Sequence, residues 1–237
     1  ANLINQARNL VWAMTREFMP LFSDLDANGD REKFTQVLFV SSRYVLAFTM
    51  PLLTGILFLG PAFIARWMGP EYAEKGKWVL YIFAGAYLLP WLNPFSNRLL
   101  TGIGRQKVLA RISSVSAVIN LALSILLVRY LGKEGVALGT MIPMIILEPV
   151  VLFYMCRCVG KSVTQYANEV IRPVLLPNLI FAGLMFLLTS HITPSTYVNI
   201  LSISLSSLTV YTLFFFLLSV NRSEQKLILS KIRERFV

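Results

Sequence analysis

Six continuous apolar runs, each of about 18 to 25 residues, dominate the chain, and short polar turns separate them. They cover residues 44–64, 78–95, 108–130, 136–159, 174–192 and 197–220. A helix needs about 20 apolar residues to cross a hydrocarbon core of about 30 Å. Because the runs are continuously apolar and do not alternate with a period of two, they predict helices and not barrel strands. The sequence therefore predicts an all-α fold, a polytopic transmembrane helix bundle.

A partial helix over residues 1–22 precedes these runs, and Pro20 is expected to end or bend it. Residues 30–43 read as an amphipathic lead-in to the first complete span. The chain begins at Ala1, inside a helix already under way, so we expect a fragment of a longer protein.

The composition excludes several classes of function. Charged residues make up only 14% of the chain and hydrophobic residues 56%, whereas soluble domains carry about 25% charged residues. The net charge of +10 comes largely from the connections between spans, and no nucleic-acid-binding motif accompanies it, so we expect no nucleic-acid partner. Cys156, Cys158 and the single histidine, His191, do not form a metal motif. No nucleophile–base pair is discernible, so neither a cofactor, a metal nor enzyme activity is expected.

Lysine and arginine are distributed unevenly over alternate connections. Of the 22 basic residues, fifteen fall on one set of connections, which includes the tail 221–237, and five fall on the other. The positive-inside rule places the richer set in the cytoplasm. We therefore expect a multi-pass membrane protein with a cytoplasmic C-terminus. The partial first helix then runs inward, which predicts an odd number of spans before Ala1 if the whole protein starts in the cytoplasm.

Four short motifs lie in a fixed order relative to the spans. They are Pro20-Leu21-Phe22-Ser23 with Asn28-Gly29-Asp30; Met68-Gly69-Pro70-Glu71-Tyr72; Leu99-Leu100-Thr101-Gly102-Ile103-Gly104-Arg105-Gln106-Lys107; and Asn120 to Gly132 with Gly135-Val136-Ala137-Leu138-Gly139-Thr140. Together they resemble the C-terminal half of polysaccharide flippases in the multidrug/oligosaccharidyl-lipid/polysaccharide exporter superfamily, which include the O-antigen and capsule repeat-unit transporters. The resemblance covers roughly residues 15–160.

The resemblance implies an architecture and a function. Residues 1–160 would form part of the C-terminal lobe of a MATE-like two-lobed transporter, residues 161–220 two additional helices, and residues 221–237 a basic cytoplasmic tail. The protein would move a polyprenyl-pyrophosphate-linked oligosaccharide from the cytoplasmic to the outer leaflet by alternating access. Its partners would be this lipid-linked oligosaccharide, membrane lipids and an N-terminal lobe that the chain lacks.

Four polar residues within apolar segments are the candidate substrate-binding residues: Arg8, Asn93, Asn97 and Glu148. Arg8 lies about 14 residues, or roughly 21 Å, from the end of its helix, and a charge at that depth should face a watery cavity or an anionic partner. A structural ion pair is the alternative. Glu148 is expected to pair with Arg8 or a coupling cation, or to hydrogen-bond between helices.

The asparagines and the glycine-containing loop leave alternatives open. Asn93 and Asn97, expected on one helix face, suit either sugar hydroxyls or helix–helix hydrogen bonds, whereas Asn120 and Asn178 favour helix packing. The loop at Gly102-Ile103-Gly104 is expected to turn the chain tightly at the membrane surface, with contact to a lipid pyrophosphate as the second interpretation.

Three other functions compete with the flippase. A drug/cation antiporter of the same superfamily would favour buried carboxylates, and only Glu148 is a clear one. A membrane glycan polymerase or ligase would carry large polar outer loops, which are short here. A scaffold without transport activity would lack a polar cavity.

Overall fold

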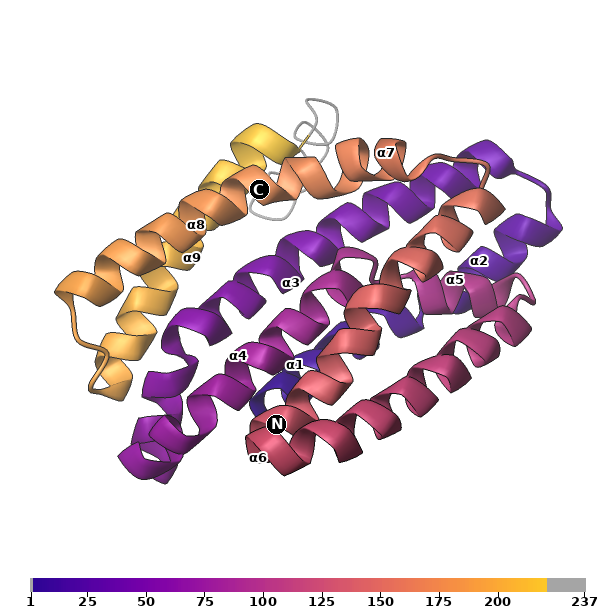
Figure 1. Ribbon diagram of the computed structural model, residues 1–237. Helices are drawn as coiled ribbons and strands as arrows, with labels where there is room; N and C mark the ends of the chain where they lie inside the picture. The colour runs from indigo at the N-terminus through magenta and orange to yellow at the C-terminus, as the bar shows by residue number, and fades with distance from the viewer. Residues whose placement is uncertain (1, 221–237) are drawn as a thin grey trace.

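The computed structural model describes residues 2–220 and builds this part of the chain from helices, with no strand among them (Figure 1). The predicted all-α fold is confirmed. Four of these helices are long and apolar enough to cross a membrane, and the number rises to five if the bent pair of helices at residues 70–102 counts as one span. The expected amphipathic tail, residues 221–237, lies outside the described residues.

The helices follow one another with short connections. Their bounds are α1 Asn2–Arg16, α2 Phe18–Ala27, α3 Arg31–Met68, α4 Pro70–Leu92, α5 Ser96–Gly102, α6 Gln106–Cys158, α7 Val163–Tyr166, the π-helix η1 Ala167–Ile171, α8 Arg172–His191 and α9 Tyr197–Ser219. The break between α1 and α2 falls at Glu17, three residues before Pro20. Because Pro20 has no N–H to donate to the carbonyl four residues earlier, the helix breaks at that point, as the sequence predicts.

The element α6 consists of two helices that run in opposite directions and meet at Gly132 (Figure 1). Gly132 has a φ of +57°, which favours glycine. A Cβ at Gly135 would lie 2.3 Å from the carbonyl oxygen of Leu127, and one at Gly139 would lie 2.8 Å from the backbone nitrogen of Ser124. The two glycines, four residues apart, therefore let the arms pack backbone against backbone, as small residues do between membrane helices.

With α6 divided at Gly132, each expected span corresponds to a helix. These are α3, α4 with α5, the two arms of α6, α8 and α9. The interfacial lead-in at residues 30–43 is not a separate helix but the first part of α3, which is 38 residues long.

The basic residues gather at one end of the bundle, where the connections α2–α3, α5–α6 and α6–α7 lie (Figure 1). We call this the basic end. Within the described residues it carries Arg31, Lys33, Arg43, Arg98, Arg105, Lys107, Arg111, Arg157, Lys161 and Arg172. The opposite end carries Arg66, Lys75, Lys77, Arg129 and Lys133. This arrangement has the alternation that the positive-inside rule requires; the assignment of the basic end to the cytoplasm remains a prediction.

The long helix α3 is the centre of the bundle, because it packs against α1, α4, α8 and α9. Two tyrosines bond to backbone across helices. The Tyr211 hydroxyl on α9 donates to the carbonyl of Ala47 at 2.7 Å, and the Tyr166 hydroxyl donates to the carbonyl of Leu92 at 3.1 Å. These bonds fix α9 against α3, and α7 against the end of α4. No pattern in the sequence specified these two contacts.

Candidate functional site

Arg8 lies at the border between the packed and the open side of α1. Ile4, Ala7 and Val11 form a buried stripe on this helix, with the spacing of one helical face. Arg8 is next to that stripe and half-buried, and its Nη1 donates to the hydroxyl of Tyr87 on α4 at 3.3 Å. The tyrosine thus holds the guanidinium at the edge of the bundle instead of covering it.

One helical turn beyond Arg8, Trp12 pairs with a second arginine. The indole of Trp12 is 61% exposed, and the guanidinium carbon of Arg98, on the short helix α5, lies 5.1 Å from the ring centroid. This is a cation–π contact. In the sequence, Arg98 served only as one of the basic residues that indicate membrane orientation. The one sequence signal for this contact was Trp12, which lies four residues after Arg8 and so on the same helix face.

Together these side chains form a continuous surface, which we call the α1–α5 surface and define as Arg8, Trp12, Tyr87 and Arg98. Residues four apart on a helix are neighbours, so Arg8 and Trp12 join the two contacts into one patch. Two guanidinium groups can each present paired N–H donors to phosphate oxygens. A large exposed indole offers a flat apolar face with a polar edge, which suits the C–H face of a sugar ring.

The two asparagines expected to share a face are separated by a bend. The chain leaves α4 at Asn93 and re-forms a helix at Ser96, with an angle of 44° between α4 and α5. Asn93 is buried, and neither its Oδ1 nor its Nδ2 has a hydrogen-bond partner among residues 2–220. Asn97 is exposed and directly precedes Arg98 in the chain. The expected shared face is therefore not formed, because Pro90 and Pro94 flank the break and prevent a continuous helix.

Glu148 lies on the second arm of α6 and is half-buried. Among the described residues the ion pairs are Lys75–Glu71 and Lys133–Glu134, so Glu148 and Arg8 are not paired in this structure. No group of three or more metal-ligating side chains occurs in the described part of the chain.

Asn120 and Asn178 form hydrogen bonds between helices, as the packing interpretation predicts. The Nδ2 of Asn120 donates to the hydroxyl of Thr140 at 3.1 Å, across the two arms of α6. The Nδ2 of Asn178 on α8 donates to the hydroxyl of Thr54 on α3, also at 3.1 Å. Both are therefore occupied in holding helices together.

The glycine-containing loop makes a tight turn between α5 and α6. Gly104 has a φ of +72°, and the N–H of Arg105 donates to the carbonyl of Leu100 at 2.7 Å. A Cβ at Gly102 would lie 3.0 Å from the carbonyl oxygen of Met19 in α2. The turn interpretation of this loop therefore accounts for both glycines.

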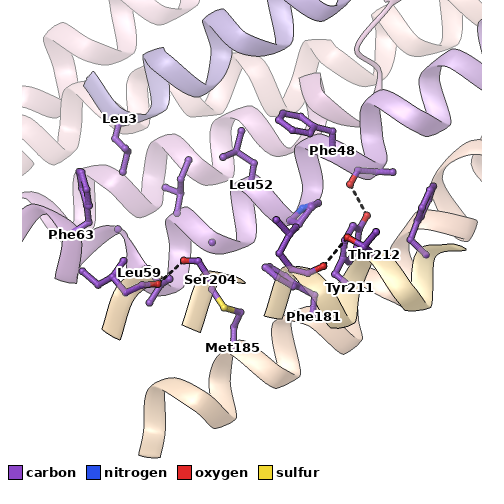
Figure 2. A pocket seen from close by; sticks show the side chains of 18 of the residues that line it. Leu3, Phe48, Leu52, Leu59, Phe63, Phe181, Met185, Ser204, Tyr211 and Thr212 are labelled. Carbon is purple, nitrogen blue, oxygen red and sulfur yellow. Dashed lines mark hydrogen bonds between the residues drawn. The ribbon is translucent and has the colours of Figure 1, made fainter. Parts of the chain in front are cut away.

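An apolar groove of about 620 Å³ lies between α3 and the pair α8 and α9. Figure 2 shows Phe48, Leu52 and Phe63 facing it from α3, with Phe181 and Met185 on the opposite wall. None of the described residues that line the groove is charged. The groove suits hydrocarbon and offers a phosphate no described cation, so the α1–α5 surface is the better site for an anionic cargo.

Comparison with known proteins gives two distant relatives. The chain is 25% identical over 153 residues to a putative O-antigen transporter of Shigella dysenteriae, an alignment that covers 65% of this chain and 37% of that protein. It is 24% identical over 174 residues to a probable low-salt glycan biosynthesis flippase of Haloferax volcanii, with 73% of this chain and 36% of the relative covered.

The chain spans little more than a third of the length of these relatives. No protein-family model matches it, and no solved structure matches it. The two similarities support a relationship to polysaccharide flippases and agree with the apolar helices of a multi-pass membrane protein.

Proposed function

We propose that this chain is part of a transporter that moves a polyprenyl-pyrophosphate-linked oligosaccharide from the cytoplasmic to the outer leaflet of a bacterial inner membrane. The observation that carries the proposal is the α1–α5 surface, where Arg8 and Arg98 flank an exposed tryptophan. An arginine inside a membrane span is costly unless it faces water or an anion. A pyrophosphate supplies the anion, and the attached sugars supply a partner for the indole.

In this proposal each residue has a distinct role. Arg8, held by Tyr87, binds the pyrophosphate, and Arg98 adds a second positive charge one helical turn away along the surface. Asn97, which is exposed, offers its amide to sugar hydroxyls. Asn93 reaches the cargo only if the break between α4 and α5 opens, because its side chain is buried in this conformation.

Transport would proceed by alternating access. A MATE-like N-terminal lobe, absent from this chain, would close the other side of the cavity, and the two lobes would rock to expose the α1–α5 surface to each membrane face in turn. The lipid tail would stay in the bilayer while the charged head group and the sugars cross.

The test is transport by the full-length protein carrying Arg8→Gln, measured as the appearance of lipid-linked oligosaccharide in the outer leaflet of proteoliposomes. Removing a charged hydrogen-bond donor costs about 1.5–3 kcal/mol, so we expect transport to fall about tenfold or more. Arg8→Lys keeps the charge but loses the paired N–H donors and should be intermediate.

Arg129→Gln is the matched control. It removes the same charge from an exposed position on the first arm of α6, at the end opposite the basic end and outside the α1–α5 surface, and should leave transport near the level of the unmodified protein. Equal transport by the Arg8→Gln and Arg129→Gln proteins, at matched amounts in the membrane, would contradict the assigned role of Arg8.

A second candidate, the drug/cation antiporter, is favoured by one observation. Glu148 is a half-buried carboxylate without an ion-pair or hydrogen-bond partner among the described residues. The antiporter predicts that Glu148→Gln abolishes efflux of a cationic dye while Arg8→Gln does not. The flippase predicts no dye efflux by any of these proteins.

A further inference from the structure

A second cavity, of about 890 Å³, lies at the basic end, apart from both the α1–α5 surface and the apolar groove. One wall is the first part of α3. The other wall is α7 with η1, together with the connection between α6 and α7. In Figure 1 α7 lies alongside the first turns of α3. We call this cavity the interfacial pocket.

The interfacial pocket carries an excess of positive charge. Arg31, Arg43 and Lys161 line it, together with the carboxylates Glu32 and Glu169. Arg43 is only 8% exposed, whereas Arg31 and Glu32 lie at the exposed start of α3. The cations therefore extend from the rim of the pocket to its buried wall, while the acidic groups lie at the exposed rim.

Glu169 is held by a neighbour within the same wall. The Nε2 of Gln165 donates to its Oε1 at 2.8 Å. Glu169 and Asn168 stand on η1, a five-residue π-helix between two α-helices. Single π turns of this kind are rare in proteins, and those that occur are often found at functional sites. No pattern in the sequence marks this turn, and it brings two polar side chains to the pocket.

The length of α3 places the pocket at the membrane surface. Its 38 residues correspond to about 57 Å of helix, far more than the hydrocarbon core of about 30 Å requires. The continuously apolar part begins at Tyr44. We therefore place residues 31–43, several of which line the pocket, in the head-group region, where lipid phosphates are found.

We propose that the interfacial pocket binds the phosphate head group of an anionic phospholipid, with Arg31, Arg43 and Lys161 facing the phosphate. Basic pockets between membrane helices at such a surface bind phospholipid head groups in other proteins. The apolar side chains of Phe39 and Val40 line the pocket together with the cations. The pocket can therefore contact both the charged head group and the apolar part of a lipid. The proposal does not depend on the transported cargo, because none of these residues belongs to the α1–α5 surface.

The test is native mass spectrometry of the purified full-length protein, titrated in detergent with dioleoyl phosphatidylglycerol or with dioleoyl phosphatidylcholine. We expect tighter binding of phosphatidylglycerol. Lys161→Gln should weaken that binding about fivefold, the effect of one basic side chain near an anionic surface. Glu169→Gln should strengthen it, because the substitution removes a negative charge from the rim.

Lys33→Gln is the matched control, since Lys33 is exposed in the same first turn of α3 and does not line the pocket. It should bind phosphatidylglycerol as the unmodified protein does. Equal affinity for the two lipids, equal weakening by Lys33→Gln and Lys161→Gln, or unchanged or weaker binding to the Glu169→Gln protein would overturn the proposal. Displacement of the lipid by millimolar inorganic phosphate would instead assign the pocket to free phosphate and would also overturn it.

Discussion

The close approach of the two α6 arms makes a strong prediction about a single methyl group. A Cβ at Gly135 would lie 2.3 Å from the carbonyl oxygen of Leu127, 2.5 Å from its carbonyl carbon and 2.9 Å from the nitrogen of Val128. All three are backbone atoms, so no side chain can rotate away. Gly135→Ala therefore forces the two arms apart.

The expected magnitude follows from two opposing effects. Overpacking a close contact costs about 1–3 kcal/mol, and a rigid backbone contact belongs at the upper end of that range. Replacing glycine by alanine inside a helix favours the helix by about 1 kcal/mol. We therefore expect Gly135→Ala to lower the free energy of unfolding by about 2 kcal/mol.

Gly183→Ala is the matched control, because Gly183 lies inside α8 and a Cβ there would meet no atom within 4 Å. It makes the same chemical change without the contact, so it should raise the free energy of unfolding by about 1 kcal/mol. The two substitutions should have opposite signs.

Thermal unfolding of the purified protein in detergent measures both. For a chain of this size about 1 kcal/mol corresponds to a shift of about 2–4 °C in the unfolding midpoint. We expect the midpoint of the Gly135→Ala protein to fall and that of the Gly183→Ala protein to rise. If both midpoints rise together, the arms of α6 do not approach each other at Gly135, and the reasoning is refuted.

Three further substitutions test other contacts by the same unfolding measurement. Tyr211→Phe removes the donor to the carbonyl of Ala47 and should cost about 1 kcal/mol; an unchanged midpoint would mean that the hydroxyl does not hold α9 against α3. Thr54→Val and Asn178→Leu, combined in a double-mutant cycle, should show a coupling of about 0.6 kcal/mol, and additive effects would exclude their hydrogen bond. Asn93→Leu should leave stability unchanged or raise it, since the buried amide has no hydrogen-bond partner in the part of the chain that the structure describes; a large loss of stability would show that the amide is bonded after all.

The sequence was sufficient for the features that the membrane itself imposes. A helix that crosses hydrocarbon must satisfy its own backbone groups and must be apolar over about 20 residues, whatever surrounds it. The apolar runs that form α8 and α9 could therefore each be predicted as a membrane helix without knowledge of the other helices. The turns at Gly104 and Gly132 were also readable, because a positive φ at a short turn favours glycine wherever it occurs.

The site residues depended on distances between helices, and a one-dimensional pattern does not contain them. Arg98 contacts Trp12 from α5, which departs from α4 by 44° at the break near Asn93, and at this break Asn93 is buried and Asn97 is exposed. Arg8 could have met Glu148 or another partner, and its hydrogen bond to Tyr87 follows from how α1 packs.

The sequence by itself determined which segments are membrane helices and which turns carry the positive charge, since both follow from local chemistry. Only the tertiary structure decided which polar side chains of different helices meet: Arg98 with Trp12, Arg8 with Tyr87, and the three cations of the interfacial pocket. The physical reason is that helix packing brings residues close that lie far apart along the chain, as Trp12 and Arg98 do, and no period in the sequence specifies that packing.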